Sequence, residues 1–356
     1  MTNRIAKLAD KIAECDLDAY VASRSPNIRY YTGSIGGSHL IVTPDRDPLL
    51  LVSVLDESVT RDQARDCTVD TYTPASLLER FADALRGSHS VRVGFDDLPL
   101  PLLTRLRSRL PEVCFTQNPE VVWQQRMVKD AGEIKLMSVA GKLADRAMQA
   151  LKEKLAIGVT EYELGAEASY SMMREGAEAH SFEFTVGSGP RSAYPHASVT
   201  GRKIARSDLI VVDIGATHGG YCSDITRTFV AGKPDGKKAT IYDTVLRSHE
   251  ATFKVMKPGA GCKEVDGVSR KIIEDAGYGA NYTHSLGHGV GLEIHEPPSV
   301  SQRSAERLEA GNVVSDEPGI YIHEYGGVRI EDTVLLTPKG PKRLTDFPRK
   351  LEEAVF

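Results

Sequence analysis

The feature that most constrains this chain is a pair of aspartates on the two arms of an expected β-hairpin. Residues 208–216 are apolar and β-branched, residues 217–220 (Thr-His-Gly-Gly) indicate a turn, and residues 221–230 indicate a second strand. If those four residues form the turn, counting outward along both strands sets Asp213 directly opposite Asp224. Paired Cβ atoms lie about 4.5–5.5 Å apart, so two carboxylates there repel each other unless a cation lies between them. The hairpin therefore predicts a metal site, unless the turn has another length or a bulge turns one aspartate to solvent.

Further acidic and imidazole groups follow the hairpin. His288 lies between glycines that allow close backbone approach, and Glu317 directly precedes a Pro-Gly turn. In residues 328–334 the strand alternation sets Arg329 on the same face as Glu331. Each feature alone has an ordinary explanation, because a histidine in a glycine-rich strand is often a packing residue and Arg329 with Glu331 could form a salt bridge. In combination they favour a metal centre.

Four carboxylates and one imidazole form a hard, oxygen-rich ligand set. Its members are Asp213, Asp224, His288, Glu317 and Glu331. Such a set suits Mn²⁺ or Co²⁺, with Zn²⁺ and Fe²⁺ as alternatives, and two ions per subunit are needed to absorb its charge. Two metals about 3.5–4 Å apart can lower the pKa of a shared hydroxide and polarise a carbonyl. Hydrolysis is the natural reaction of such a site.

The chain divides into two expected domains. Its 356 residues exceed one typical domain, and a hydrophobic content of 41% is ample for two cores. Residues 1–123 alternate helix and strand signals, which predicts a small α/β domain. Residues 124–356 begin with a long helix and continue with hairpins and helices, which predicts an α+β domain. In that domain Thr160 and Glu163 form a capping box that starts a second helix.

Charge and cysteine usage argue against several partners. The net charge of -5 gives no electrostatic reason to expect nucleic acid or an anionic membrane surface, and no run approaches a membrane span. The first twenty residues carry charges throughout and lack the apolar core of a signal peptide. Five scattered cysteines without a C-x-x-C pair fit a reducing compartment. We therefore expect a cytoplasmic protein with no nucleic-acid or membrane partner.

Six short motifs follow one another in the second half of the chain. They are residues 188–196 (SGPRSAYPH), the Asp213 to Asp224 spacing, residues 287–291 (GHGVG), residues 295–297 (HEP), residues 317–321 (EPGIY) and residues 327–332 (GVRIED). Together they resemble the creatinase/aminopeptidase P/prolidase family of metallopeptidases with the pita-bread fold, and the match spans nearly all of the chain. Residues 27–33 (NIRYYTG) also resemble the N-terminal domain of that family. The resemblance implies a creatinase-type α/β N-terminal domain, an α+β pita-bread catalytic domain and a homodimer.

The resemblance also implies a role for each metal ligand. Asp213 would bind one metal in bidentate fashion, while Asp224 and Glu331 would bridge the two ions. His288 and Glu317 would complete the second metal, and Glu317 would help to activate the bridging hydroxide. These are the five residues that the spacing argument proposes.

Substrate contacts are implied for residues outside this ligand set. His196 and His295 would hydrogen-bond the substrate carbonyl and the tetrahedral intermediate. Archaeal-type prolidases often carry an arginine shortly after the His-Glu-x-Pro motif to hold the dipeptide carboxylate, whereas residues 297–300 here are Pro-Pro-Ser-Val. Arg329 or Arg191 would then hold that carboxylate instead. The departure leaves open whether dipeptides or longer peptides are preferred.

We therefore expect a dinuclear-metal Xaa-Pro peptidase, of aminopeptidase P or prolidase type, that hydrolyses the bond preceding proline with a metal-bridging hydroxide. The N-terminal domain favours this function, because methionine aminopeptidases share the five ligands but usually lack the domain. Creatinase shares the domain but not the ligands. The alternatives are another amide or C–N hydrolase or a lyase on the same scaffold, or a non-enzymatic binding protein of the same fold. A binding protein predicts lost ligands, yet every one is present.

Overall fold

The computed structural model of the chain describes residues 4–87 and 91–356. Its internal contacts divide the chain into two compact units, Met1–Arg126 and Met127–Phe356. Helix α6 (Glu120–Arg126) runs across the 123/124 boundary expected from the sequence, so the division by contacts falls three residues later, at the end of this helix. No helix among the described residues combines the length and apolar character needed to cross a bilayer.

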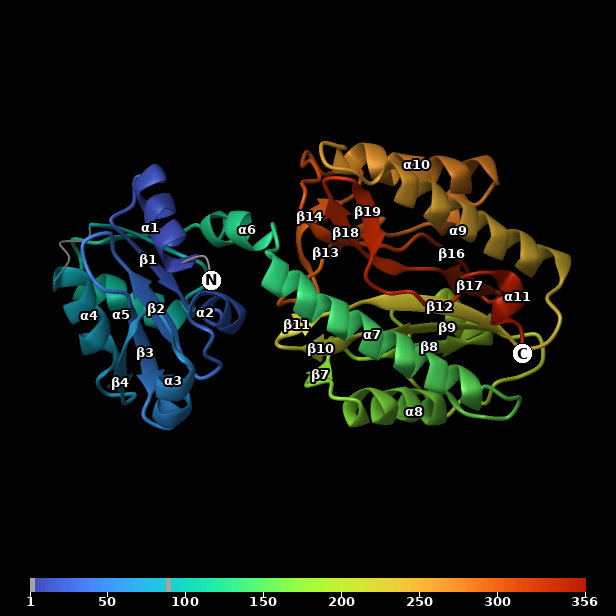
Figure 1. Cartoon of the computed structure of the whole chain (residues 1–356), viewed down its shortest axis with the longest axis horizontal. Helices are drawn as coiled ribbons and strands as arrows, with labels where there is room; N and C mark the ends of the chain where they lie inside the picture. Colours follow the sequence, from blue (N-terminus) through green and yellow to red (C-terminus); the bar gives the residue numbers. More distant parts are fainter. Residues whose placement is uncertain (1–3, 88–90) are drawn as a thin grey trace. The chain divides into compact units, whose positions relative to one another are not determined.

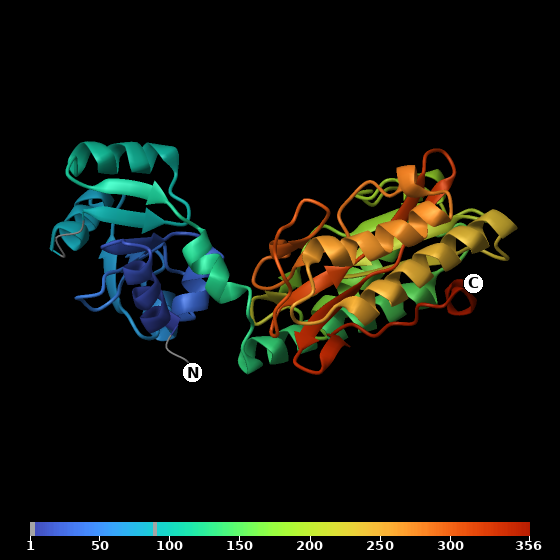
Figure 2. The same ribbon diagram turned by 90° about the horizontal axis from the view of Figure 1, so that it is seen from above.

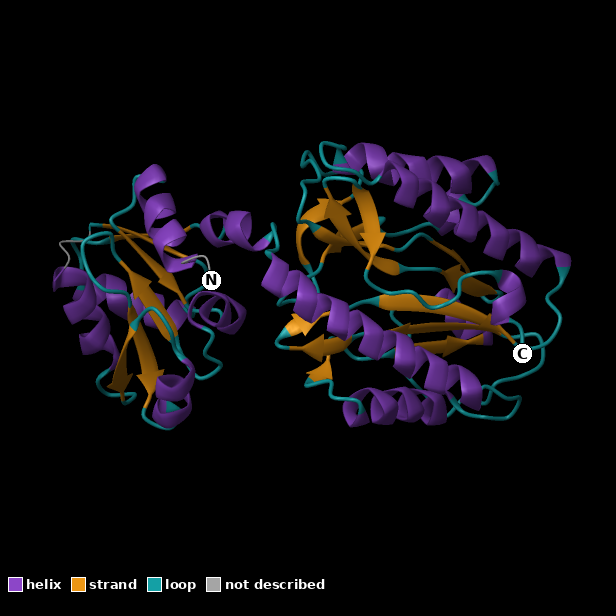
Figure 3. Ribbon diagram, in the orientation of Figure 1, coloured by secondary structure: helices purple, strands orange, loops and turns teal. Residues whose placement is uncertain are grey.

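The N-terminal unit is built on a six-stranded mixed sheet in the order β4-β3-β2-β1-β5-β6. Helices α4 and α5 pack on one face of the sheet, where Phe81 and Leu106 join a core with Val21 and Val93, and α1 and α2 lie on the other face (Figures 1 and 3). The strands are β1 (Ala19–Ala22), β2 (His39–Val42), β3 (Leu49–Ser53), β4 (Thr68–Tyr72), β5 (Arg92–Phe95) and β6 (Cys114–Gln117). The helices are α1 (Arg4–Glu14), α2 (Ser25–Thr32), α3 (Glu57–Gln63), α4 (Leu77–Gly87) and α5 (Leu100–Arg109). The predicted α/β class of this domain is confirmed.

In the C-terminal unit, two pairs of helices enclose several short antiparallel sheets. Helices α7 (Ala131–Lys154) and α8 (Glu161–Arg174) pack together on one side, and α9 (Gly236–Val255) and α10 (Cys262–Asp275) pack together on the other. Figure 1 shows the strands between these pairs, and Figure 2 shows α9 and α10 lying over them. The predicted α+β class, with the pita-bread arrangement, is confirmed.

The strands of this unit form four sheets, in the orders β12-β9-β8, β11-β10-β7, β14-β13-β15-β18-β19 and β16-β17. The strands that precede α9 are β7 (Ala179–His180), β8 (Thr185–Ser188), β9 (Leu209–Ile214), β10 (Ala216–His218), β11 (Tyr221–Cys222) and β12 (Ile225–Val230). Those that follow α10 are β13 (Gly287–Gly289), β14 (Glu296–Val300), β15 (Val313–Asp316), β16 (Gly319–Ile322), β17 (Gly326–Arg329), β18 (Asp332–Thr337) and β19 (Gly340–Arg343). Short 3₁₀ helices, Gly189–Ala193 and Gly279–Asn281, and a terminal helix α11 (Leu351–Ala354) complete the unit.

Local sequence signals explain where the first two helices of this unit begin. Asp130 and Glu133 form a capping box at the start of α7. At α8, Glu163 N donates to Thr160 Oγ1 at 3.2 Å, and Thr160 N donates to Glu163 Oε2 at 2.8 Å, which confirms the predicted capping box. Both helices therefore start where side chains satisfy otherwise unpaired backbone amides.

The aspartate-bearing hairpin forms, but its register differs by two residues from the predicted one. Gly219 and Gly220 have φ of +59° and +82° and make a two-residue turn, because a type I′ turn needs positive φ at both positions. The two residues before them belong to β10 rather than to the turn. Asp213 therefore pairs with Thr226, and the prediction that it faces Asp224 directly is wrong. Because an even register shift leaves each side chain on its face of the sheet, both aspartates still line one cavity.

Candidate active site

One cavity of the C-terminal unit, with a volume of about 470 Å³, collects the candidate site residues predicted from the sequence, except Arg191. Its lining includes Asp213, Asp224, His288, Glu317, Glu331, His196, His295 and Arg329. These residues come from separate hairpins that are far apart in the chain. The fold thus brings together side chains that the sequence could only group by their chemistry.

Two of the candidate ligand carboxylates, Glu317 and Glu331, stand where strands end or break. Glu317 follows the last residue of β15, and its amide donates to Leu286 O at 2.9 Å. Glu331 lies in a gap between β17 and β18, so the continuous strand expected over residues 328–334 is interrupted. Its amide donates to Thr226 O at 3.0 Å, and its Oε2 accepts from Thr226 Oγ1 at 2.7 Å. Backbone anchors thus fix these residues while the strand breaks turn their side chains into the cavity.

The imidazole of His288 lies at the centre of the ligand cluster. Its Nε2 is 3.2 Å from Glu317 Oε1 and 3.7 Å from Asp224 Oδ2. Asp224, His288 and Glu331 each offer a ligand atom, and these atoms lie within 4.8 Å of one another. This spacing matches a set of side chains that share a metal ion.

Three buried carboxylate oxygens in the cavity lack any hydrogen-bond donor among the described residues. They are Asp213 Oδ1, Asp224 Oδ1 and Glu331 Oε1. An unpaired buried carboxylate oxygen is costly, and three in one cavity favour a bound positive charge. Divalent cations bound by these oxygens satisfy all three at once, so the residues present fit a metal centre.

The electrostatics of the cluster lead to the same conclusion. Burial raises the pKa of Asp224 well above its ordinary value, and the carboxylates of Glu331 and Asp213 raise it further. Burial, followed by Glu317 and Asp213, also raises the pKa of Glu331 well above its ordinary value. Burial alone would raise the pKa of Glu317, but the hydrogen bond from His288 lowers it to about 2. Bound cations would lower these raised pKa values and so favour ionisation of the whole cluster near neutral pH.

Arg329 is held by the protein at several atoms. Its Nη2 donates to Asp213 Oδ2 at 2.7 Å, its Nε to Thr226 Oγ1 at 3.0 Å, and its Nη1 to Tyr321 Oη at 2.8 Å and Pro195 O at 3.1 Å. Its ion pair is therefore with Asp213. The alternative that Arg329 forms a salt bridge with Glu331 is wrong. Arg329 orients the carboxylate of Asp213, a candidate ligand, and has little capacity left for a substrate carboxylate.

Three histidines outside the ligand set line the same cavity. The His295 ring lies 4.3 Å from the His288 ring, centroid to centroid, and His196 follows the 3₁₀ helix Gly189–Ala193. The sequence analysis missed His284, whose Nε2 is 3.0 Å from Tyr321 Oη, and it did not assign Tyr321 to the site. The available signal for His284 was its position four residues before His288.

The fold and this ligand cluster define a metalloenzyme. Residues 135–338 match the sequence model of metallopeptidase family M24, and residues 4–128 match that of the creatinase/prolidase N-terminal domain. This chain therefore belongs to metallopeptidase family M24, and the predicted family is confirmed.

Similar proteins named as proline peptidases cover nearly all of the chain. A Xaa-Pro dipeptidase of Pyrococcus horikoshii is 36% identical over 353 residues, which is 99% of each chain. The crystal structure of the prolidase from Pyrococcus horikoshii OT3 has a TM-score of 0.92 at 37% identity and covers 98% of this chain and 99% of its own. The structure of an X-Pro aminopeptidase from Thermotoga maritima MSB8 has a TM-score of 0.90 at 32% identity and covers 99% of both chains.

Proposed function

We propose that this chain hydrolyses the peptide bond preceding a proline, using two divalent metal ions held in the cavity. The ligands would be Asp213, Asp224, His288, Glu317 and Glu331. The observation that carries the proposal is the set of three unpaired carboxylate oxygens in one buried cavity. Relatives named as a Xaa-Pro dipeptidase and an X-Pro aminopeptidase support the substrate class. Mn²⁺ or Co²⁺ suits this oxygen-rich set best, and Zn²⁺ and Fe²⁺ also fit it.

The chain's own residues would position the substrate and move its protons. When bound, the cations would supply a nucleophilic hydroxide near neutral pH and polarise the scissile carbonyl. Glu317, whose pKa is lowered to about 2, is ionised and available to accept a proton from the attacking water. His196 and His295 stand on the cavity wall, where either ring can donate a hydrogen bond to the carbonyl oxygen.

An apolar part of the cavity wall suits the proline ring. Phe182, Phe184 and Ile294 line the cavity beside the polar cluster. A pyrrolidine ring packed against such side chains leaves water, whereas the polar groups remain free for the reacting bond. The wall thus supports a substrate with a compact apolar residue next to the scissile bond.

The cavity offers no free guanidinium to select a dipeptide by its carboxylate. Among the described residues that line it, Arg329 is the only lysine or arginine, and its donors are engaged by protein groups. Arg191 is not among the residues that line the cavity. Its Nη2 donates to Ser198 O, and its Nε lies 3.6 Å from Glu161 Oε2. We therefore expect longer Xaa-Pro peptides to be accepted as well as dipeptides.

A panel of matched peptides tests the function and this length tolerance. Ala-Pro, Ala-Pro-Ala and the capped Ala-Pro amide should all be cleaved before proline with Mn²⁺ or Co²⁺, and their kcat/KM values should agree within about tenfold. Ala-Ala and Ala-Ala-Ala serve as controls that lack proline. A preference for the free dipeptide above about 100-fold would reveal a charged clamp on its carboxylate. Intact proline peptides under every metal would contradict the peptidase function itself.

We also propose that the protein acts as a homodimer in the cytoplasm. The likeness of residues 4–128 to the creatinase/prolidase N-terminal domain supports the dimer, and the five unpaired cysteines support a reducing compartment. The alternatives of a C–N hydrolase, a lyase or a binding protein are not favoured, because all five ligands converge in one cavity and the relatives are named as peptidases.

A further inference from the structure

A pair of directly facing carboxylates lies just behind the proposed ligand cluster. Asp316 at the end of β15 pairs directly across the ladder with Asp332 at the start of β18. The next residue beyond this pair on each strand is a proposed ligand, Glu317 on one and Glu331 on the other. Both aspartates are fully buried, and directly opposed carboxylates repel each other. The last rung before the ligands therefore needs a cation of its own.

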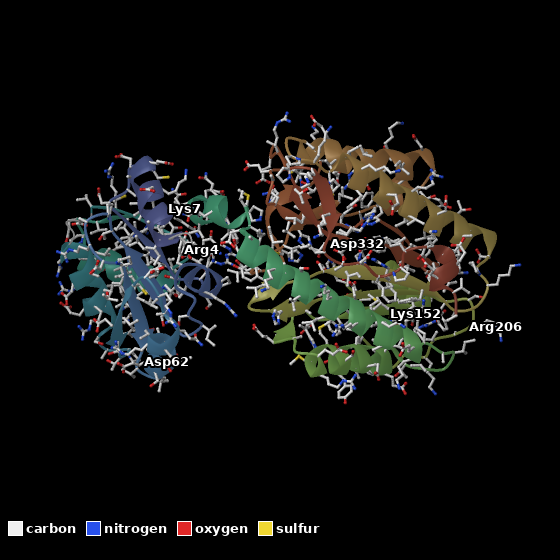
Figure 4. The ribbon with its side chains drawn as sticks, in the orientation of Figure 1. Arg4, Lys7, Asp62, Lys152, Arg206 and Asp332 are labelled. Atoms are coloured by element: carbon white, nitrogen blue, oxygen red, sulfur yellow. The ribbon has the colours of Figure 1, made fainter. Side chains whose placement is uncertain are left out.

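His249, which projects from α9, supplies that cation. Its Nε2 lies 3.0 Å from Asp332 Oδ2, and its Nδ1 lies 3.2 Å from Asp316 Oδ2 and 3.1 Å from Asp316 O. All these partners are acceptors, so both ring nitrogens must carry a hydrogen and the ring is an imidazolium. The ring is fully buried, and Figure 4 marks Asp332 within the C-terminal unit. His249 thus links Asp316 and Asp332, which directly adjoin the proposed ligands Glu317 and Glu331.

The two aspartates depend on His249 to different degrees. Asp332 is also paired with three arginines, which are Arg227, Arg343 and Arg349. Asp316 accepts a hydrogen bond from Thr252 Oγ1 at 2.6 Å, and His249 is its only cationic partner among the described residues. Loss of the imidazolium would therefore release the end of β15, which directly precedes Glu317. The start of β18 would be affected less, because the arginines still hold Asp332.

We propose that His249 is a positioning residue that fixes Glu317 relative to Glu331 and so sets the spacing of the metal ligands. Without the ring, the carboxylate of Asp316 would face that of Asp332 and lose its cationic partner, and the end of β15 would shift away. The inference rests on the proposed function, because it takes Glu317 and Glu331 as metal ligands. It assigns His249 no contact with substrate or metal.

Cobalt binding to the metal-free protein tests this role without reference to turnover. The His249→Gln variant keeps a donor of similar length but not the charge. Co²⁺ affinity, measured by calorimetry, should fall by about 10- to 100-fold, and the visible spectrum of bound Co²⁺ should change. Circular dichroism of each metal-free variant shows whether it is folded.

Two neighbours on α9 provide matched variants. Ser248 is buried beside His249, but its Oγ lies 2.8 Å from Ser269 Oγ on α10, so Ser248→Ala removes a buried hydrogen bond without touching β15. Co²⁺ affinity should stay within about twofold of wild type in this control. Thr252→Val removes a neutral hydroxyl whose partners are Asp316 Oδ1 and the carbonyls of Ser248 and His249. It leaves the imidazolium in place, so it should lower the affinity by a smaller factor than His249→Gln. If His249→Gln does not fold, the comparison of Thr252→Val with Ser248→Ala decides the question.

The possible results separate this inference from the function on which it rests. If wild-type protein binds no Co²⁺, the ligand set fails and the inference fails with it. If wild type binds Co²⁺ and a folded His249→Gln binds it with the same affinity and spectrum, only the role of His249 is overturned. An equal loss of affinity in Ser248→Ala would also overturn it, because the effect would then be one of helix packing.

Discussion

The Asp224→Asn variant should lose hydrolysis of proline peptides by at least about 10³-fold while keeping its fold. One carboxylate oxygen of Asp224 lies within 4.8 Å of ligand atoms of His288 and Glu331. Its Oδ1 has no hydrogen-bond donor among the described residues. An amide in its place removes one negative charge from the shared ligand set. Charge stabilisation by bound cations supplies several kcal/mol to such reactions, and about 4 kcal/mol corresponds to this factor. The measurement is kcat/KM for Ala-Pro-Ala with saturating Mn²⁺.

A matched control for this variant is Asp145→Asn. The carboxylate of Asp145 lies outside the cavity and accepts the backbone amide of Asp346 at 2.9 and 3.0 Å. Asn can accept the same bond, so activity should remain within about twofold of wild type. Near-normal turnover in a folded Asp224→Asn protein would contradict the bridging role of Asp224.

Metal-free protein should be less stable at about pH 7.5 than at about pH 5.5, and Mn²⁺ should reverse the loss. Burial and neighbouring carboxylates raise the pKa values of Asp224 and Glu331 in the folded state. At these two carboxyls the folded protein therefore binds more protons than the unfolded chain, so their contribution to stability falls as pH rises from the unfolded pKa of about 4 towards the raised folded values. Free Mn²⁺ at about 100 times its Kd adds about 2.7 kcal/mol, which is about 5–10 °C in melting temperature.

The Asp224→Asn protein isolates the contribution of the cluster to this pH dependence. Without metal at about pH 7.5, it should melt above the metal-free wild type, because one of the repelling charges is gone. It should gain little from Mn²⁺. Calorimetry of both proteins at the two pH values, with and without Mn²⁺, gives the comparison. Equal melting temperatures of wild type with and without Mn²⁺ would contradict a metal site in this cavity.

The chemistry of the site could be predicted from the sequence, but its geometry only in part. Residue types and their order give the candidate ligands, and all five line one cavity. The hairpin register depended on the length of one turn, and a two-residue Gly219-Gly220 turn moved the partner of Asp213 from Asp224 to Thr226. The Gly219-Gly220 pair was itself the local signal for the tighter turn, because both central positions of a type I′ turn need positive φ, and the four-residue interpretation missed it. The face was predicted correctly because the error was an even number of residues.

Contacts between distant segments left no signal in a single sequence. His249 lies within an ordinary amphipathic helix, and only the pairing of Asp316 with Asp332 gives it a role. Likewise Arg329 was expected to serve the substrate, whereas Asp213 and Tyr321 hold it in place. The roles of His249 and Arg329 can be assigned only from the three-dimensional arrangement, because each depends on which protein groups accept hydrogen bonds from the side chain.

Titration of metal-free protein with Mn²⁺, while hydrolysis of Ala-Pro-Ala is recorded, tests the central claim most directly. The carboxylate cluster predicts no turnover without metal, a rise with each addition, and a plateau near two equivalents per chain. Turnover that persists after complete removal of metal, or an absence of turnover at every ratio of Mn²⁺ or Co²⁺ to protein, would contradict it.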